Sequence, residues 1–294
     1  MPTFDVFLST YRFDLTSLIV SLLAAGLYLA GVIALRSRGH RWPMPRTAAF
    51  ILLGVGLYAW VNFGFFGTYS HDLRWAFTTR IALLLFGVPL VMSIGRPIAL
   101  VLTVLRQVPR KRLRRVLKSW PVRLMSNAIF APIFALVLFM FFITPIAGQV
   151  RHSGLAENII TVAIPILGLI MVLPLVSHQT HRSSLFITGE FMLAFVELML
   201  DAIPGVVLSI SNVVMDGVTE VIANAPAWFP SALNDQHFSG NLLWMIAEGG
   251  DLPLLIMLLI RWRKSDRKEA RKTDDLSEEE YQALVAAHLR GPRS

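Results

Sequence analysis

Long apolar stretches separated by short polar segments run along the whole chain. Each is close to the roughly 20 residues that a helix needs to cross a bilayer, and none shows the alternating pattern of a membrane β-strand. Because every backbone amide in hydrocarbon must be bonded within the protein, each stretch predicts a transmembrane helix. The predicted spans are residues 15–35, 47–66, 76–94, 124–146, 159–176, 185–210 and 240–260, the third ending where Gly95-Arg96-Pro97 interrupts an apolar run that continues to residue 105.

Basic residues gather in alternate loops between these spans. The first and third loops and the segment after the last span are rich in Arg and Lys, whereas residues 211–239 contain neither. Positive charge is retained in the cytoplasm. The pattern therefore predicts an all-α integral membrane protein, a bundle of about seven transmembrane helices with the N-terminus outside and the C-terminus in the cytoplasm.

Two segments outside the spans also have helical patterns. Residues 213–225 place apolar side chains at helical spacing and are followed by Trp228, which predicts a short helix at the outer interface. Near the C-terminus, Ser277 and Glu280 fit a capping box, and the apolar residues that follow share one face. We therefore divide the chain into a transmembrane domain, residues 1–262, and a charged cytoplasmic tail with one short helix, residues 263–294.

Composition supports this interpretation. Of the 294 residues 55% are hydrophobic, the formal charge is +8, and cysteine is absent, which excludes disulfides and thiolate metal sites. The basic clusters adjoin apolar spans, so they indicate membrane topology and anionic headgroups, and no nucleic-acid partner. No basic region precedes the first apolar stretch, so we expect it to be a retained helix and not a cleaved signal peptide.

Charged residues within the predicted spans are costly and are candidate functional groups. The third span contains Arg80, with Arg96 at its inner end, and the sixth has its acids at spacings that place them on one helical face. Their depths predict an ion pair between Arg80 and Asp201. Such a pair would either fix the register of two helices or form part of a proton or ion path. The predicted network comprises Arg80, Arg96, Glu190, Glu197 and Asp201.

The histidines all lie outside the predicted spans. His71, His152 and His237 would share the outer side and could meet in a metal site together with methionines, but none is spaced as helical ligands are, and loop histidines are more often solvated. No nucleophile motif, phosphate loop or Rossmann glycine pattern is present. We therefore expect a protein that is not an enzyme.

Two short motifs carry a family resemblance. The third span ends in Pro-Leu-Val-Met-Ser-Ile-Gly-Arg-Pro, and the last begins with Asp-Gln-x-x-x-Gly-x-x-x-Trp. In order and approximate spacing these resemble the bacterial CtaG-type cytochrome c oxidase assembly family, over roughly residues 15–262. The motif positions are Gly95, Pro97, Asp235, Gln236, Gly240 and Trp244. The resemblance implies a multi-pass protein of the bacterial plasma membrane, linked to maturation of haem–copper oxidases at the step of copper supply.

The chain departs from this family at its membrane histidines. The positions that correspond to them carry Phe77, Ile81, Ala163 and Asp201. Imidazole can coordinate copper, whereas phenylalanine, isoleucine and alanine cannot. The resemblance thus makes copper a candidate cofactor, but the expected ligands are missing, and we predict a divergent member with no assigned cofactor.

Three hypotheses follow for the function. The first is a non-catalytic membrane assembly factor for a respiratory haem–copper oxidase, acting through helix–helix contacts with oxidase subunits or with another assembly factor. The second is an ion or small-solute transporter that uses the charged residues, favoured by prolines that could break the spans at Pro89 and Pro204. The third is a copper-handling protein with the outer histidine site.

Overall fold

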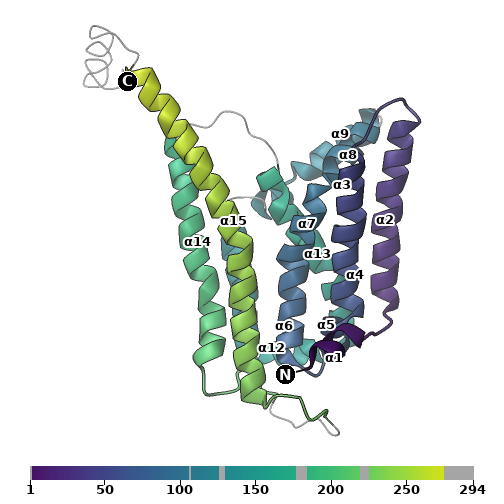
Figure 1. Cartoon of the computed structure of the whole chain (residues 1–294), viewed down its shortest axis with the longest axis vertical. Helices are drawn as coiled ribbons and strands as arrows, with labels where there is room; N and C mark the ends of the chain where they lie inside the picture. Colours follow the sequence, from purple (N-terminus) through teal and green to yellow (C-terminus); the bar gives the residue numbers. More distant parts are fainter. Residues whose placement is uncertain (1, 106, 126–129, 177–183, 219–224, 275–294) are drawn as a thin grey trace.

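The computed structural model describes residues 2–105, 107–125, 130–176, 184–218 and 225–274, and most of their side chains. Within these ranges all regular structure is helical (Figure 1). Four of the described helices are long and apolar enough to cross a membrane, namely Leu15–Arg36, Met44–Tyr69, Arg74–Ile94 and Gly154–Val172. They correspond to the first, second, third and fifth predicted spans.

The first two spans begin at residues that suit a helix start. Helix α2 (Leu15–Arg36) follows Asp14, whose carboxylate accepts a hydrogen bond from the backbone N–H of Ser17 at 2.6 Å. The second span has proline near its first position, where no N–H is needed. It comprises α3 (Met44–Ala48), the π-helical η1 (Ala49–Val55), α4 (Gly56–Phe63) and α5 (Phe65–Tyr69).

Proline does not break the third span, which comprises α6 (Arg74–Ala82), η2 (Leu83–Gly87) and α7 (Val88–Ile94). Pro89 has no N–H, so the carbonyl of Leu85 loses its α-helical partner. The wider π-helical turn of η2 absorbs this defect. Gly168 then packs against the same carbonyl, because a Cβ there would lie only 2.0 Å from the Leu85 oxygen.

The predicted end of the third span is confirmed. Helix α7 stops at Ile94, and α8 (Pro97–Val104) begins after a single left-handed residue, Arg96, with φ of 51°. A residue before proline is disfavoured in the right-handed helical region. Arg96 therefore changes the direction of the chain at this point, and its side chain is exposed.

Short helices occupy much of the chain between α8 and α13 (Gly154–Val176). The basic third loop forms α9 (Gln107–Leu117), and the region of the fourth predicted span is divided into α10 (Trp120–Met125), α11 (Phe130–Met140) and the single-turn η3 (Phe141–Ile143). The bundle end opposite α9 carries α12 (Pro145–Arg151) and the N-terminal α1 (Phe4–Ser9) (Figure 1).

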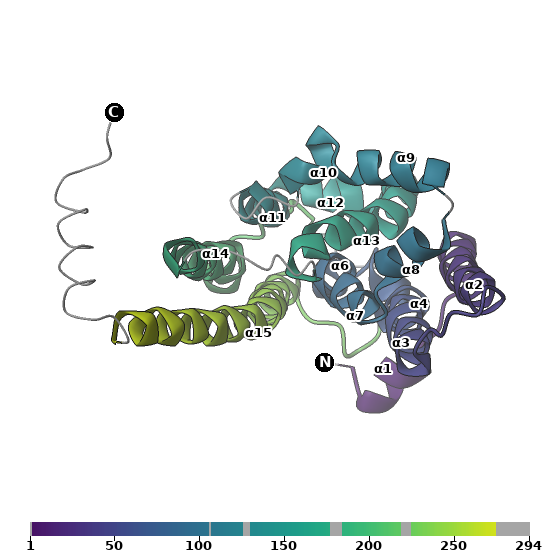
Figure 2. The ribbon, with the colours of Figure 1, turned by 90° about the horizontal axis from the view of Figure 1, so that it is seen from above.

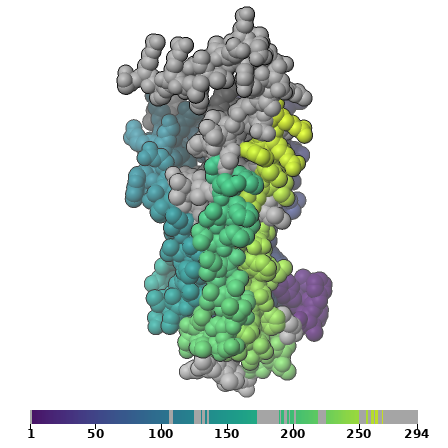
Figure 3. Space-filling model, turned by 90° about the vertical axis from the view of Figure 1, so that its left-hand side faces the viewer, coloured from purple at the N-terminus to yellow at the C-terminus, as the bar shows by residue number. Residues whose placement is uncertain are grey.

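Helices α14 (Ser184–Ile210) and α15 (Ala232–Asp274) lie side by side (Figures 1 and 3). Pro204 lies within α14 without ending it, so the expected break there is absent. At their contact, a Cβ on Gly240 would lie 2.4 Å from the Gly205 carbonyl oxygen, so the two backbones approach directly. Viewed from above, the pair stands to one side of the remaining helices (Figure 2).

Two predicted short helices have different outcomes. The outer helix expected at 213–225 is wrong for its described part, because Val213 to Val218 form turns, with Gly217 at a φ of +71°. The predicted tail helix lies outside the described residues. Helix α15 itself starts eight residues before the predicted span and continues to Asp274, beyond the end predicted for it.

The apolar core lies between α2, the second and third spans and α13. It includes fully buried Val61, Leu84, Leu85 and Val88, and it extends to Leu208 of α14 and Leu243 of α15. Most remaining large apolar side chains of α2 and α14 face outward, as expected for helices whose solvent is lipid.

Candidate functional site

Two groups of charged side chains are buried where α6 and α13 begin, near the bundle end that carries α12 and α1 (Figure 1). We call the first the Arg80–Glu157 cluster, which contains Arg12, Asn62, Ser70, His71, Arg80, Glu157 and Thr161. We call the second the Arg74–Asp216 cluster, which contains Arg74, Arg151, Asp216, Asp235 and Gln236.

Arg80 is the centre of the first cluster and is only 2% exposed. Its Nε and Nη2 donate to Asn62 Oδ1 at 3.1 and 2.9 Å, and Nη2 also donates to Thr161 Oγ1 at 2.8 Å. Its Nη1 donates to Ser70 Oγ at 3.2 Å and to Glu157 Oε1 at 3.0 Å. All five N–H donors of the guanidinium are thereby used, and Arg80 joins the second span, the third span and α13.

Glu157 collects three basic groups in the first turn of α13. Besides Arg80, its carboxylate accepts hydrogen bonds from Arg12 at 3.1 and 3.3 Å and lies 2.7 Å from His71 Nε2. The side chain of Glu157 is 12% exposed, whereas that of Arg12 is 36% exposed. The Arg80 contact is therefore the desolvated one, and it carries more weight than the Arg12 contact, which solvent screens.

Arg74, the first residue of α6, organises the second cluster. Its Nη1 lies 3.6 Å from Asp216 Oδ1 and donates to Gln236 Oε1, while its Nη2 donates to the carbonyl of Phe142. Arg151 of α12 reaches the other Asp216 oxygen at 3.3 Å. Both arginines and Asp216 are at most 4% exposed, so α6, α12 and the segment after α14 share one buried ionic contact.

Asp235 caps α6 from another helix. Leu73, at the N-cap of α6, has no side chain that could accept the first N–H groups. The two carboxylate oxygens of Asp235 instead accept from the backbone N–H of Arg74 at 2.7 Å and of Trp75 at 2.8 Å. A carboxylate at this position also interacts favourably with the positive end of the helix dipole. Helix α15 therefore fixes the start of α6.

Gln236 and aromatic side chains complete this end of the protein. Gln236 is fully buried, accepts from the Met215 N–H at 2.8 Å and donates to the Val213 carbonyl at 3.0 Å. Phe65, Phe66 and Trp75 pack around the start of α6, with Trp228 against Phe65 at a ring distance of 5.9 Å. Such packing excludes water and strengthens the buried ionic contacts.

The chemistry of both clusters is that of neutralisation. Each carboxylate accepts from arginine side chains or helix N–H groups. The Arg74–Asp216 cluster has two arginines and two carboxylates, whereas the Arg80–Glu157 cluster has two arginines and His71 around one carboxylate. Within the described residues no nucleophile is bonded to a base in either cluster. Their arrangement fixes where α4, α6, α12, α13 and α15 lie relative to one another.

The structure pairs Arg80 with Glu157, and the predicted ion pair between Arg80 and Asp201 stays a prediction, because the Asp201 side chain lies outside the described residues. Arg80 directs all five N–H groups to other residues, and its carboxylate partner is Glu157. The physical reason is register, because α13 presents Glu157 and Thr161 at the depth of Arg80. The side chains of Glu190, Glu197 and Asp201 lie outside the described residues, and their shared face stays a prediction.

Arg96 is not part of either cluster. Its side chain is exposed at the turn between α7 and α8, and it makes no ion pair within the described part of the chain. The prediction placed it at the inner end of the third span and included it in the charge network. The left-handed turn places it outside the helix instead.

The three outer histidines do not come together. His71 contacts Glu157, His152 Nδ1 lies 2.8 Å from the Gly148 carbonyl oxygen, and His237 Nε2 lies 2.9 Å from that of Ser211. Among the described residues no group of three or more His, Cys, Asp or Glu side chains is placed to hold a metal. The proposed outer metal site is therefore not assembled.

The residues at the family-motif positions make contacts that hold helices together. Besides Asp235 and Gln236, Gly95 lets its backbone approach Phe50 and accepts a hydrogen bond from the Tyr28 hydroxyl at 2.8 Å. Pro97 begins α8. Gly240 forms the close contact with α14, and Trp244 packs its Cβ beside Gly205 and donates to Glu248 at 2.6 Å.

Three of the four positions where the resemblance implies histidines lack a metal-binding atom, and the side chain of the fourth, Asp201, lies outside the described residues. Phe77 and Ile81 are 4% and 3% exposed in the apolar core, where Phe77 packs edge-on against Phe142. The third position, Ala163, has no donor atom. Since the described positions offer no coordinating atom, we assign no copper to them.

Sequence reasoning missed Glu157, the main carboxylate of the site. It lies two residues before the predicted fifth span and was therefore treated as a loop residue. One signal could have identified it, because Glu157 is the only acidic residue between Asp72 and Glu190. A single carboxylate in a long stretch rich in arginine is the natural partner of a buried arginine.

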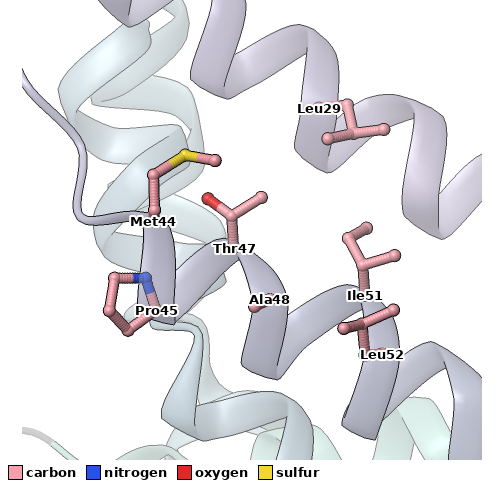
Figure 4. Close-up of a pocket in the computed structure, with 7 residues that line it drawn as sticks. All are labelled: Leu29, Met44, Pro45, Thr47, Ala48, Ile51 and Leu52. Carbon is pink, nitrogen blue, oxygen red and sulfur yellow. The ribbon is translucent and has the colours of Figure 1, made fainter.

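A shallow apolar groove lies elsewhere, between α2 and the start of the second span (Figure 4). It encloses about 430 Å³ and contains no ionisable side chain. Its lining supplies no group for catalysis or metal binding, so we do not place the site there. The lining residues are Leu29, Met44, Pro45, Thr47, Ala48, Ile51 and Leu52.

Comparison with known proteins identifies the family. The chain is 25% identical to uncharacterized proteins of Mycobacterium bovis and Mycobacterium tuberculosis and 22% identical to one of Mycobacterium leprae, each over 95% of this chain and 43% of the relative. It thus spans less than half the length of these relatives. No solved structure matches it. The family model of the cytochrome c oxidase caa3 assembly factor matches residues 26–265, and the protein therefore belongs to the Caa3_CtaG family.

Proposed function

We propose that the protein is a non-catalytic assembly factor for a respiratory haem–copper oxidase in the bacterial plasma membrane. The observation that carries this proposal is the family match, which includes six of the seven predicted spans in full and residues 26–35 of the first. The buried clusters support a structural role, because their buried arginines bind carboxylates that lie on other segments of the fold, and these contacts hold helices in register.

The proposed mode of action is contact between helices within the membrane. Helix α14 turns a row of large apolar side chains outward, including Phe195 at 49%, Ile203 at 41% and Ile210 at 72% exposure. Lipid tails are as apolar as a partner helix, so hydrophobicity alone does not favour either on this face. Selective binding of a partner helix must therefore depend on complementary packing. We propose that this α14 face is where an oxidase subunit or another assembly factor docks.

The proposed topology has seven spans with the N-terminus outside and the C-terminus inside. It is supported by the placement of the basic α9 at one end of the bundle and of α1 and α12 at the other (Figure 1). The positive-inside rule assigns the α9 end to the cytoplasm. Residues 263–294 would then form a cytoplasmic tail that begins on α15.

A deletion strain tests the proposed function. Removal of the gene should lower the haem absorbance and the activity of the oxidase in isolated membranes, and the wild-type chain should restore both. A tagged chain should also co-purify oxidase subunits in mild detergent. Normal oxidase spectra and activity in the deletion strain would contradict the proposal.

Paired variants test the α14 face. The double variant Phe195→Ala and Ile203→Ala should reduce rescue and co-purification without changing the amount of protein in the membrane. The matched control is Leu22→Ala with Leu23→Ala on α2, whose side chains are 63% and 57% exposed at the opposite edge of the protein (Figure 2). Equal loss with both pairs would argue against a docking surface on α14.

A further inference from the structure

Helix α9 separates basic and apolar side chains onto opposite faces. Successive residues rotate by about 100° around a helix. Leu113, Val116 and Leu117 therefore lie on one face, and Trp120, which begins α10, continues it. The other side carries six basic residues, five of them within α9 and the last directly after it, namely Arg110, Lys111, Arg112, Arg114, Arg115 and Lys118.

The fold leaves both faces of α9 largely uncovered. All six basic side chains are exposed, and none forms an ion pair with another described residue. On the apolar face, Val116 is 58% and Trp120 is 69% exposed. An amphipathic helix without a partner for its apolar side needs a further surface to bury it.

The orientation of α9 indicates what that surface is. Seen from above, α2 and α4 are viewed nearly end-on, whereas α9 is viewed from its side (Figure 2). Helix α9 thus lies across the end of the bundle, roughly parallel to the plane of a membrane that the long helices would cross. It is directly connected through α8 to the third span.

We propose that α9 and Trp120 form an interfacial helix that binds anionic phospholipid headgroups of the leaflet at this end of the bundle. The apolar face enters the boundary between headgroups and acyl chains, and the basic side chains extend to the phosphates. Tryptophan prefers this depth. A nucleic acid or an acidic protein would satisfy the cations but would leave Val116 and Trp120 in water.

Single-cysteine labelling tests the proposal, because the chain contains no native cysteine. Val116→Cys on the apolar face and Arg112→Cys on the basic side are each labelled with a polarity-sensitive fluorophore. The full chain is reconstituted in vesicles of phosphatidylcholine with or without phosphatidylglycerol. Quenching by iodide reports water, and quenching by lipids carrying a nitroxide reports membrane depth.

The label at position 116 should be quenched by the nitroxide lipids and shielded from iodide, more strongly when phosphatidylglycerol is present. The label at position 112 should remain open to iodide in both membranes. Added salt should weaken the effect of phosphatidylglycerol, since the attraction is electrostatic. Each basic residue strengthens binding to an anionic surface by about fivefold.

A charge variant separates electrostatic binding from simple burial. In the Val116→Cys background, replacing Arg110, Lys111, Arg114 and Arg115 by glutamine should reduce the docked population at least ~10-fold in vesicles with phosphatidylglycerol. Exchanging Lys for Arg or Arg for Lys at the same positions should preserve docking. The proposal is overturned if the position-116 label is equally open to iodide in both membranes. It is also overturned if nitroxide quenching is the same with and without phosphatidylglycerol and unchanged in the glutamine variant.

Discussion

At the scale of single residues, Glu157 binds one buried arginine and one partly exposed arginine, and the two contacts differ in how much they stabilise the protein. Arg80 and Arg12 both bind Glu157, but their side chains are 2% and 36% exposed. An ion that has lost its water depends on its partner, whereas an exposed ion regains water when the partner is removed. Removing Glu157 should therefore be costly mainly because Arg80 stays buried.

We expect Glu157→Gln to lower the free energy of unfolding by roughly 3 kcal/mol, because it leaves the Arg80 charge buried and uncompensated. Unfolding of the purified protein in mixed micelles, followed by circular dichroism during titration with a denaturing detergent, measures the change. The control is Glu248→Gln, which removes a carboxylate bonded to the Trp244 indole N–H. Glutamine can still accept that bond, so the change there should stay within ~0.5 kcal/mol.

Variants of the two arginines show which contact of Glu157 accounts for its effect on stability. Arg12→Gln should cost at most about 1 kcal/mol, because solvent already screens this contact. Arg80→Gln combined with Glu157→Gln should recover part of the loss caused by Glu157→Gln alone, since no buried arginine is then left without its carboxylate. Strictly additive losses for Arg80 and Glu157 would show that the pair is not coupled.

The sequence supported part of this residue-scale picture. The buried position of Arg80 was predictable, because a charged residue in an apolar helix must face the protein interior. Its partner was not, because pairing depends on which helices are neighbours and on their relative depth. Sequence spacing places acids on one face of a helix but does not determine which arginine that face meets.

At the scale of helices, glycine controls how closely α14 and α15 approach. Gly205 and Gly240 face each other, and a methyl group on Gly240 would meet the backbone oxygen of Gly205 at 2.4 Å and Ser209 Oγ at 2.6 Å. A backbone atom cannot rotate away as a side chain can. Small residues at such contacts let two helices pack tightly in a membrane, where dispersion contacts hold them together.

We expect Gly240→Ala to lower the free energy of unfolding by about 1–3 kcal/mol through forced separation of the two helices. Gly249→Ala on the same helix is the matched control, because no atom lies within 4 Å of the added methyl group. It should leave stability unchanged or raise it by up to ~1 kcal/mol, since alanine favours the helix. The same detergent titration measures both, and a loss of equal size in the two variants would refute the packing explanation.

The sequence predicted helices correctly where hydrophobicity determines whether a segment is helical. It predicted them poorly where specific tertiary contacts determine the local structure. The apolar stretches at α2, α6–α7 and α13 identified helices because burial in lipid requires them. The segment that forms α9 was expected to be a loop, because it is dense in Arg and Lys. Its few apolar residues nevertheless recur at helical spacing. The helix expected at 213–225 is absent from its described part, residues 213–218, because Met215 and Asp216 bind Gln236 and two arginines in a turn.

At the scale of the whole molecule, charge is distributed between the two ends of the bundle. One end carries α9 and the basic residues between α2 and α3, almost all exposed, whereas the other end buries its arginines against carboxylates. Few basic residues lie at the second end compared with the α9 end, and three of them are buried and bonded to carboxylates. Arg74, Arg80 and Arg151 therefore do not oppose the proposed topology, although they lie near the outer end.

This topology predicts how cysteines introduced at the two ends react. Asp72→Cys lies on an exposed turn before α6, and His40→Cys lies on the exposed segment after α2. With the N-terminus outside, a maleimide that cannot cross membranes should label position 72 in intact cells and position 40 only after permeabilisation. The native chain, which has no cysteine, gives the background. Both substitutions replace exposed polar residues, so they should not disturb folding. Reversed labelling would therefore show that the bundle is inserted the other way, and it would place α9 in the outer leaflet.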